Sequence, residues 1–336
     1  MVLRKIFLLP GIWRVKQLYE TGFRLLIKEM KVIFCYHILK IRPPKKMPYH
    51  IGGIQLTNLC NSNCVFCSYR KINDRKCVMN LGLYKKVIDG YLEMGIKKIG
   101  FYSTIGEPLM DPDFYDKMKY AKSKGMEIFI CSNGILIYKY LNQILSLEIE
   151  ELIISLSDLD YEIESEVFGI GKIVARKKIE GILRLISKNN NKINIKKISL
   201  YFRPKRKPYK IMQNKLFEEI TKYSYVDCSF LLGYDNWCGL IKKRDLKGIM
   251  RLLRPIRFRK YPCIHLFYPI VFPNGCVSVC CRASEIVKND FIIGNVKKET
   301  LAEIMNNDQI KQTIQGFKYG KMPKKCTKCN NYMPCI

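Results

Sequence analysis

Short apolar runs alternate with longer segments of helical periodicity through the middle of the chain. The apolar runs predict six β-strands, at residues 51–57, 96–103, 127–132, 151–157, 197–202 and 226–232. The segments between them carry apolar residues at a helical spacing and predict helices at residues 81–94, 112–124, 138–147, 174–188 and 209–223. Regular alternation of strands and helices is typical of a parallel sheet covered by helices. The sequence therefore predicts an α/β fold built from six β/α units.

Turn residues support several of the predicted helix ends. Asp111 and Pro112 can supply an N-cap and a first-turn proline for the helix at residues 112–124. Gly95 and Gly125 stand where two helices should stop, because glycine readily adopts the left-handed conformation that ends a helix.

The first 48 residues are a basic segment that precedes the alternating pattern. Apolar residues lie near helical spacing between Leu18 and Phe34, with lysines and arginines between them. We expect a helical extension that packs on the α/β core, since apolar stripes usually serve packing. The alternative is an amphipathic helix on an anionic membrane surface. The segment makes a poor signal peptide, and no apolar run of about eighteen residues predicts a spanning helix.

Composition and charge narrow the class of protein. The chain has 336 residues, enough for one large or two modest domains, and its hydrophobic content of 48% indicates a packed core. Its fifteen cysteines cluster at metal-binding spacings, so we expect a reducing, cytoplasmic compartment with contact to a membrane at most at its periphery. The formal net charge is +30, and basic residues concentrate at 203–210 and 242–260. Such runs are most often solvated surface, and otherwise they bind an anionic partner.

Three cysteines after the first predicted strand carry the most specific signal. Cys60, Cys64 and Cys67 lie within eight residues as C-x3-C-x2-C. Three thiolates can hold three corners of an iron–sulfur cluster and leave one iron without a protein ligand. Structural zinc needs four closed ligands, and no fourth Cys or His lies at a suitable spacing. The triplet therefore predicts a cluster with one open iron.

The triplet and the motifs after it resemble the radical S-adenosylmethionine (radical SAM) family. Phe66 takes the aromatic position of that family's C-x3-C-x-aromatic-C loop, Gly106-Glu107-Pro108 is similar to its Gly-Gly-Glu-Pro motif, and Ile105 departs from its first glycine. The resemblance implies a partial (β/α)6 TIM-like barrel. All these motifs fall at or after the carboxyl ends of strands, the face of such barrels that carries active sites.

The resemblance also implies roles for individual residues. Cys60, Cys64 and Cys67 would hold a [4Fe–4S] cluster that reduces S-adenosylmethionine to a 5′-deoxyadenosyl radical. Residues expected to bind S-adenosylmethionine are Phe66 through nearby backbone, Gly106, Glu107, Ser132, Asn133, Ser155 and Ser157. For the serines and the asparagine, helix or turn capping is the alternative. Arg203 is a weaker candidate for pairing with the carboxylate.

The C-terminal cysteines resemble a SPASM domain or its shorter twitch form. Cys263, Gly275 and Cys280, followed by the C-x2-C pair Cys326 and Cys329, have that order. The resemblance implies one auxiliary [4Fe–4S] cluster on these four cysteines, with a zinc ribbon as the alternative. Three other cysteines are possible substitute ligands: Cys276, Cys281 and Cys335. The remaining ones are expected to be ordinary small buried residues: Cys35, Cys77, Cys131, Cys228 and Cys238.

These inferences divide the chain and predict its function. We expect a basic helical extension (1–48), a radical SAM core (49–235), a basic bridge (236–262) and an auxiliary cluster domain (263–336). The predicted function is radical oxidation or modification of a sugar, cyclitol or other small metabolite, which a basic site would suit if the substrate is phosphorylated. An external donor such as flavodoxin or ferredoxin would supply electrons. The alternatives are a peptide-modifying maturase and, from other classes, a zinc-ribbon nucleic-acid-binding protein, which we do not favour, or an electron carrier.

Overall fold

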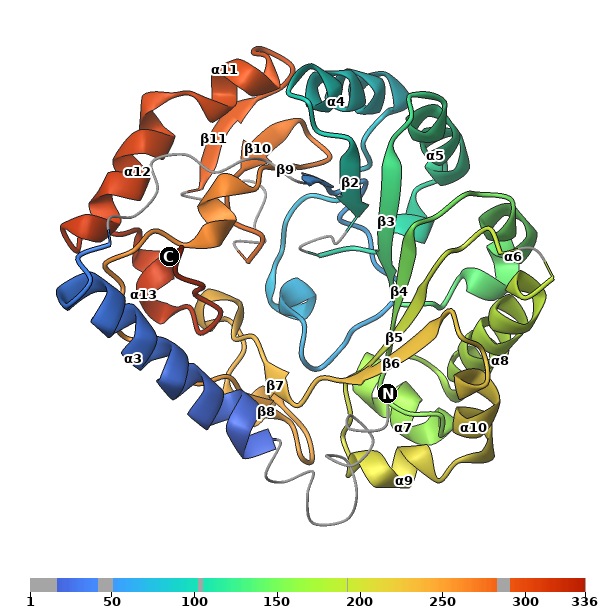
Figure 1. Ribbon diagram of the computed structural model, residues 1–336. Helices are drawn as coiled ribbons and strands as arrows, with labels where there is room; N and C mark the ends of the chain where they lie inside the picture. The colour runs from blue at the N-terminus through green and yellow to red at the C-terminus, as the bar shows by residue number, and fades with distance from the viewer. Residues whose placement is uncertain (1–16, 42–50, 102–104, 192, 283–290, 336) are drawn as a thin grey trace.

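The computed structural model describes residues 17–41, 51–101, 105–191, 193–282 and 291–335. Six strands pair in parallel in chain order and curve around the centre of the molecule (Figure 1). They are β1 (Gly52–Ile54), β2 (Lys98–Phe101), β3 (Glu127–Ser132), β4 (Glu151–Leu156), β5 (Ile198–Phe202) and β6 (Val226–Phe230). The predicted partial barrel of six β/α units is confirmed.

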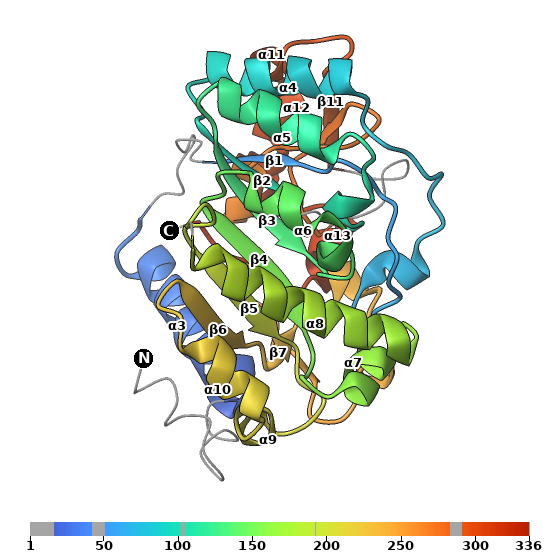
Figure 2. The ribbon, with the colours of Figure 1, turned by 90° about the vertical axis from the view of Figure 1, so that its right-hand side faces the viewer.

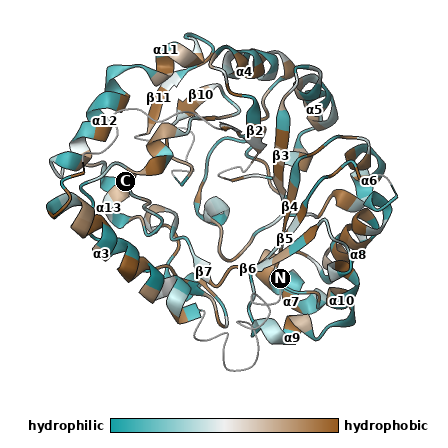
Figure 3. Ribbon diagram, in the orientation of Figure 1, coloured by the Kyte–Doolittle hydropathy of each residue, from teal (hydrophilic) through white to brown (hydrophobic). Residues whose placement is uncertain are grey.

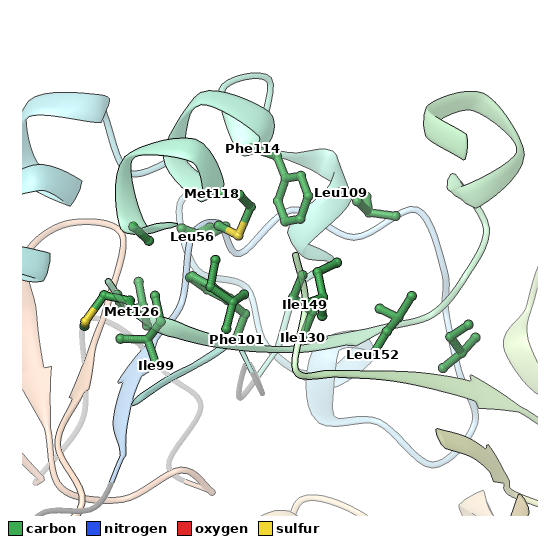
Figure 4. Packing of buried hydrophobic residues seen from close by; sticks show 14 of the residues in the cluster. Leu56, Ile99, Phe101, Leu109, Phe114, Met118, Met126, Ile130, Ile149 and Leu152 are labelled. Carbon is green, nitrogen blue, oxygen red and sulfur yellow. The ribbon is translucent and has the colours of Figure 1, made fainter. Parts of the chain in front are cut away.

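Helices cover the outer face of this sheet (Figure 2). They are α4 (Leu81–Glu93), α5 (Phe114–Ser123), α6 (Ile137–Leu145), α7 (Tyr161–Phe168), α8 (Lys172–Asn189), α9 (Pro208–Met212) and α10 (Lys215–Thr221). Between α5 and the sheet, Phe114 and Met118 pack over Phe101 and Ile130 in a buried apolar layer (Figure 4). Burial of these apolar side chains stabilises the packing of α5 on the sheet.

Local capping explains where the helices depart from the predicted ranges. The helix predicted at 209–223 is two helices, because the Asn214 side chain caps the amide of Leu216 and starts α10. Asp111 does not cap α5; its carboxylate accepts from the amide of Asp113 and pairs with Lys117. Gly95 ends its helix with a positive φ of 76°, as expected.

The C-terminal region extends the same sheet rather than forming a separate one. Strand β9 (Ile270–Val271) pairs in parallel with β1, and β10 (Cys276–Ser278) and β11 (Ile292–Asn295) follow antiparallel. The nine-stranded sheet runs in the order β11-β10-β9-β1-β2-β3-β4-β5-β6. Helices α11 (Leu301–Met305), α12 (Asp308–Lys318) and α13 (Lys324–Lys328) lie on the same side of the ring in Figure 1.

Short elements connect these two regions. Strands β7 (Gly233–Tyr234) and β8 (Arg251–Leu252) form a separate parallel pair. The remaining turns of helix are η2 (Ser68–Lys71), η3 (Pro108–Met110), η4 (Trp237–Gly239), η5 (Lys243–Asp245) and η6 (Ile264–Phe267).

The N-terminal helix packs on the basic bridge rather than on the barrel strands. It comprises a π-helical turn, η1 (Tyr19–Phe23), and α3 (Arg24–His37), which lies along the rim of the molecule (Figure 1). The buried carboxylate of Glu29 accepts from the amides of Arg257 and Phe258, at 2.6 and 3.0 Å. Tyr36 packs edge-on against Phe258 and Tyr261. None of the described helices is both long and apolar enough to cross a membrane. The dipeptide Pro43-Pro44, which predicts a linker after this helix, lies outside the described residues.

Candidate active site and metal centres

Cys60, Cys64 and Cys67 lie in the loop between β1 and η2, at the carboxyl end of the parallel strands. Burial raises the pKa of Cys60 to about 12 and also raises the pKa of Cys64 and of Cys67. The neighbouring thiols add to the rise for Cys60 and Cys64, which shows that the three lie close together. Thiols in such a setting become thiolates when cations join them. The donor set therefore fits an iron–sulfur cluster.

Helix α7, which the sequence analysis did not predict, shapes this loop. The amide of Val65 donates to the carbonyl of Val167 at 3.0 Å, and the Ser62 hydroxyl donates to that of Phe168 at 2.8 Å. Ser62 also contacts the Cys64 sulfur at 3.0 Å. These bonds fix the middle of the cysteine loop against the end of α7.

The Phe66 ring lies in a small apolar cluster beside the cysteines. It meets Phe168 edge-on with ring centres 5.7 Å apart and contacts Tyr234. The Arg203 guanidinium lies over the ring, 4.7 Å from its centre. The carbonyl of Phe66 accepts a hydrogen bond from the Trp237 indole at 3.0 Å. This part of the loop backbone is therefore tied to the bridge between the two halves of the chain.

Glu107 is buried and joins the end of β2 to the turn after β3. Its carboxylate accepts from the Ser132 hydroxyl at 2.7 Å, the Asn133 amide at 2.6 Å and the Leu109 amide at 3.2 Å. Burial raises its pKa, because removal from water disfavours the charged form. The hydrogen bonds oppose that rise. A cation arriving beside Glu107 would be stabilised by a carboxylate that is already held in place.

The turn after β3 also reaches the cysteine loop. The Asn133 side-chain amide donates to the Asn61 side chain at 2.8 Å and lies 3.8 Å from the Cys60 sulfur. The Ser132 hydroxyl accepts from the Gly134 amide at 2.9 Å, so it also holds the turn. The structure thus brings Ser132, Asn133 and Glu107 together beside Cys60, as the motifs predicted.

A buried ion pair that was not predicted orders the end of β4. The Lys178 ammonium pairs with Glu164 and donates to the Ser155 carbonyl at 2.9 Å. Glu164 in turn accepts from the amides of Ser157 and Asp158, at 2.6 and 3.1 Å. The sequence carries a signal for this pair, since Lys178 stands on the apolar stripe of its helix, next to Ile179. A charge at such a position needs a buried partner.

Two of the predicted cofactor residues present buried polar atoms without a partner. The Ser157 hydroxyl and the Arg203 Nε have no hydrogen-bond partner in the described structure. Buried polar groups are normally paired, so each is a candidate to bind a ligand. Ser155 lies on the inner face of β4, near Cys131 on β3.

The inner face of the barrel is also polar along strands β4, β5 and β6. Ser155, Tyr201 and Ser229 are register neighbours on β4, β5 and β6, and all three are half-buried. Cys131 faces the same side, and burial raises its pKa to about 11. The row supplies hydroxyl groups to the barrel interior, with Arg203 at its open end.

Several cations of the basic bridge are paired within the protein. Arg254 pairs with Glu29 at 2.7 Å. Lys247 pairs with Glu166 at 2.9 Å, and Arg259 donates to backbone carbonyls of the C-terminal cysteines. These three cations therefore serve contacts within the protein. Arg203 and, from the C-terminal region, Arg282 lie close enough to Cys67 to oppose the rise in its pKa that burial causes.

The C-terminal cysteines line one cavity together with a fifth cysteine. Its lining includes the four predicted ligands, Cys263, Cys280, Cys326 and Cys329, and also Cys238. In the part of the chain that the structure describes, no three His, Cys, Asp or Glu side chains converge as a single metal ion would require. A cluster instead offers its irons at separate corners. Thiols arranged around a cavity fit such a cluster.

The substitute ligands lie outside that lining. Cys276 accepts from the Asn295 amide at 3.5 Å, and Cys281 contacts a ring nitrogen of His265 at 3.6 Å. The amide of Cys335 donates to the carbonyl of Pro262 at 3.0 Å. Cys238, expected to be an ordinary buried residue, instead lines the cavity.

Comparison with known families accounts for both groups of cysteines. The family model of the radical SAM superfamily matches residues 54–204. The SPASM model, described as an iron–sulfur cluster-binding domain, matches residues 263–330. The first range contains the Cys60–Cys67 loop and Glu107, and the second contains the four cysteines expected to hold the auxiliary cluster.

Curated proteins are similar over part of their length. The tungsten-containing aldehyde ferredoxin oxidoreductase cofactor-modifying protein of Pyrococcus furiosus is 26% identical over 134 residues, which are 40% of this chain and 37% of that protein. The GTP 3′,8-cyclase of Aliarcobacter butzleri is 31% identical over 134 residues, 38% of this chain and 40% of that protein. The chain thus spans about two fifths of the length of these relatives.

Solved structures share the fold over most of the chain. BtrN in complex with AdoMet and 2-DOIA has a TM-score of 0.51 at 15% identity, over 85% of this chain and 94% of that one. Streptococcus suis SuiB bound to the precursor peptide SuiA has a TM-score of 0.61 at 14% identity, over 86% and 72%. anSMEcpe with bound AdoMet has a TM-score of 0.54 at 15% identity, over 84% and 86%. At these identities the likeness concerns the fold.

Proposed function

Because the chain belongs to the radical SAM superfamily and carries a C-terminal SPASM domain, it is a radical SAM enzyme, and we propose that its substrate is a sugar, cyclitol or other small polar metabolite. Its cofactors are a [4Fe–4S] cluster, S-adenosylmethionine and an auxiliary iron–sulfur cluster. Together the first two supply a 5′-deoxyadenosyl radical that abstracts hydrogen from carbon. The zinc-ribbon alternative is wrong, since the matched C-terminal family binds iron–sulfur clusters.

Residue roles in cofactor binding follow from contacts around the cysteine loop. In this proposal Cys60, Cys64 and Cys67 hold the cluster. The Glu107 carboxylate accepts a hydrogen bond from the methionine ammonium of S-adenosylmethionine. This buried carboxylate is held by three hydrogen bonds, so it needs little reorganisation. Three further predicted residues take one of two roles, positioning Glu107 or binding the cofactor. Ser132 and Asn133 position Glu107, whereas Ser157 offers an unpaired hydroxyl to the cofactor.

The row of hydroxyl groups inside the barrel supports a small polar substrate. Ser155, Tyr201 and Ser229 are placed to donate or accept hydrogen bonds from a hydroxylated ring. The unpaired Nε of Arg203 can pair with a carboxylate or phosphate on the same molecule. This polar inner face is the observation that carries the proposal. The 2-DOIA complex of BtrN, a similar fold covered over 94% of its length, agrees with it.

A peptide substrate is the second candidate. SuiB, whose structure holds a precursor peptide, and this chain share the fold with a TM-score of 0.61. The alignment leaves 28% of SuiB uncovered, the complement of its 72% coverage. A peptide would have to present one polar side chain to the same row of hydroxyl groups.

Two assays test the enzyme and its substrate class. Anaerobically reconstituted protein should form 5′-deoxyadenosine from S-adenosylmethionine on reduction with dithionite or with flavodoxin or ferredoxin, and Cys64→Ala should abolish it. Small polyols that carry a carboxylate or phosphate should then accelerate the formation of 5′-deoxyadenosine. Deuterium at the reacting carbon of the polyol should slow the reaction. Arg203→Met should raise the KM for these polyols. Acceleration by peptides alone would overturn the small-metabolite proposal while leaving the enzyme class intact.

The outward face of α3 supports the second interpretation of the N-terminal segment, contact with an anionic membrane surface. Phe23, Met30 and Phe34 are 57%, 63% and 51% exposed and lie on the helix face opposite buried Val32. Brown segments along α3, at the rim of the molecule, mark its apolar residues (Figure 3). Further exposed apolar residues continue it: Leu18, Tyr19, Leu26, Ile27, Ile33, Ile38, Leu39 and Ile41.

Charge favours an anionic bilayer as the occupant of this face. Arg24 and Lys31 are exposed beside the apolar residues, as expected of a helix lying in a membrane interface. The protein's net charge of +30 adds a long-range attraction to anionic lipids.

Vesicle binding tests this contact. The protein should sediment with phosphatidylglycerol vesicles and far less with phosphatidylcholine vesicles, and salt should weaken the binding. Replacing Phe23, Met30 and Phe34 by Ser should weaken it at least tenfold, since each apolar insertion contributes about 1 kcal/mol or more. Replacing Ile173 and Tyr319, which are 73% and 66% exposed elsewhere, is the matched control and should change nothing. Self-association without vesicles, abolished by the α3 variant, would overturn the proposal in favour of a second copy of the chain.

A further inference from the structure

Exposed cations gather beside the loop that carries Cys60, Cys64 and Cys67. They come from the segment that follows this loop and from the start of the basic bridge. Six of them are exposed and are here called the loop cation surface: Arg70, Arg75, Lys76, Lys242, Lys243 and Arg244. They differ from the bridge cations described above, which are used in contacts within the protein.

An ion pair brings the two segments of this surface together. The Lys71 ammonium pairs with the Asp245 carboxylate at 2.8 Å, although the two residues are 174 positions apart in the chain. The same carboxylate accepts from the Lys242 amide at 2.8 Å. Residues 68–80 and 240–250 together contain eight lysines and arginines but only two acids, Asp74 and Asp245, so the surface is strongly positive.

Tyr69 links the loop cation surface to the cysteine loop. Its amide donates to the Cys67 sulfur at 3.5 Å, and its hydroxyl donates to the Cys60 carbonyl at 3.4 Å. The Lys76 ammonium donates to the same hydroxyl at 3.0 Å and lies over the ring, 4.2 Å from its centre. One half-buried side chain therefore separates an exposed cation from the expected cluster ligands. A partner bound at this surface would be close to the cluster, as electron transfer requires.

The segment that carries Arg75 and Lys76 is also fixed to the barrel. The buried Asn58 side chain, just beyond β1, donates to the Arg75 carbonyl at 2.9 Å and accepts from the Cys77 amide at 2.8 Å. The backbone below these cations is therefore held in place before a partner arrives, which suits a docking surface.

We propose that the loop cation surface is the docking site of the external reductant, and that this reductant is an acidic one-electron carrier protein such as a flavodoxin. Opposite charges steer two proteins together and fix their orientation. The reduced carrier would pass one electron to the cluster held by Cys60, Cys64 and Cys67; the carrier is oxidised, the cluster is reduced, and no bond forms or breaks. The inference rests on that cluster and not on the substrate proposed above.

Two reductants separate docking from cluster assembly. A variant that combines Arg70→Glu, Arg75→Glu and Lys243→Glu should raise the KM for reduced flavodoxin roughly tenfold in the formation of 5′-deoxyadenosine. Dithionite with methyl viologen as mediator needs no docking site, so the rate with it should stay at the parent value.

Binding of flavodoxin gives a second readout that does not depend on catalysis. The Kd of the complex, measured by isothermal titration calorimetry, should rise by the same factor in this variant. Salt should raise the Kd of the parent protein, because it screens exposed charges.

Matched variants distinguish this surface from net charge alone. Keeping the three charges, with Arg70→Lys, Arg75→Lys and Lys243→Arg, should leave the Kd near the parent value. Three exposed lysines on α6 and α8 provide a distant reversal of the same size: Lys139→Glu, Lys177→Glu and Lys188→Glu. This distant variant should also bind flavodoxin as the parent does.

Several results would overturn the proposal. One is an unchanged Kd in the variant of the loop cation surface, and another is an equal rise in the distant variant. An equal loss of rate with both reductants would show that these residues support the cysteine loop instead. Tighter binding of a single-stranded RNA oligonucleotide than of flavodoxin, lost in the same variant, would make this a nucleic-acid surface.

Discussion

Gly106 sets the backbone path that brings Glu107 beside the cysteine loop. Its φ is +98°, and a Cβ at this position would lie 2.2 Å from the carbonyl oxygen of Thr57. The next residue donates its amide to the carbonyl of Leu59 at 2.7 Å, which ties the end of β2 to the start of the loop. A side chain at residue 106 would push these two segments apart.

Gly106→Ala should therefore destabilise the protein by about 3 kcal/mol, from backbone strain and the clash together. Formation of 5′-deoxyadenosine should fall with it, because Glu107 moves. Gly95→Ala is the control, since Gly95 has a φ of +76° with open space around it and loses only about 1 kcal/mol. Denaturant unfolding measures both variants, and equal losses would show that the contact with Thr57 does not matter.

Cys131 should carry its proton at physiological pH. Burial raises its pKa to about 11, so the thiolate that reacts with alkylating agents forms only at high pH. Peptide-resolved alkylation with iodoacetamide should rise with a midpoint near pH 11 in the folded protein and near the ordinary cysteine pKa of about 8.5 in denaturant. A folded midpoint near 8.5 would mean that the thiol is open to water. A protonated thiol at this place is a competent hydrogen donor to a radical in the barrel.

Elements meet at the end of β4 through the pair formed by Lys178 of α8 and Glu164 of α7. Both side chains are fully buried. The carboxylate orders the amides of Ser157 and Asp158, and the ammonium orders the carbonyl of Ser155. One ion pair thus sets the position of two residues expected at the cofactor site.

Lys178→Met should cost about 3–5 kcal/mol, because it leaves the buried Glu164 carboxylate without its partner. Combining it with Glu164→Gln should recover part of that loss, which a double-mutant cycle of unfolding free energies measures. Arg176→Met, on the exposed side of the same helix, is the control and should leave stability unchanged. Additive losses in the double variant would show that the two side chains do not interact.

The features that the sequence predicted depend on local patterns, whereas those that it missed depend on contacts between residues far apart in the sequence. The strands and the motifs at their ends follow local periodicity, and a parallel sheet brings those ends to one edge, so Cys60, Glu107 and Asn133 could be placed together in advance. Lys178 and Glu164 could not be paired, because their partnership depends on how two helices dock. Cys238 was missed for the same reason, since its neighbours lie about 40 to 90 positions further along the chain.

On the scale of the whole molecule, the C-terminal region completes the edge of the barrel. The amide of Gly53 donates to the carbonyl of Pro269 at 3.1 Å, and that of Gln55 donates to Val271 at 2.9 Å. The strands involved are only two or three residues long, too short for periodicity to reveal. The sequence therefore suggested separate domains, whereas β1 and β9 are neighbours in one sheet.

A fragment of residues 1–262 should accordingly fail to behave as a free radical SAM core. Without β9, β1 becomes an unpaired sheet edge, and the apolar surface under α11 is exposed. We expect aggregation or loss of cooperative unfolding, measured by light scattering and thermal denaturation. A monomeric fragment that still cleaves S-adenosylmethionine would show that the sheet continuation is dispensable.

The pairing of β1 with β9 bears on how the two redox centres are spaced. Electron tunnelling weakens steeply with separation, so a flexible tether between the centres would make the transfer rate fluctuate. Here the cysteine loop grows directly from β1, and η6, which follows Cys263, leads straight into β9. The hydrogen-bonded pairing of β1 with β9 would therefore fix the distance between the two centres and, in the function proposed above, their distances from a substrate in the barrel.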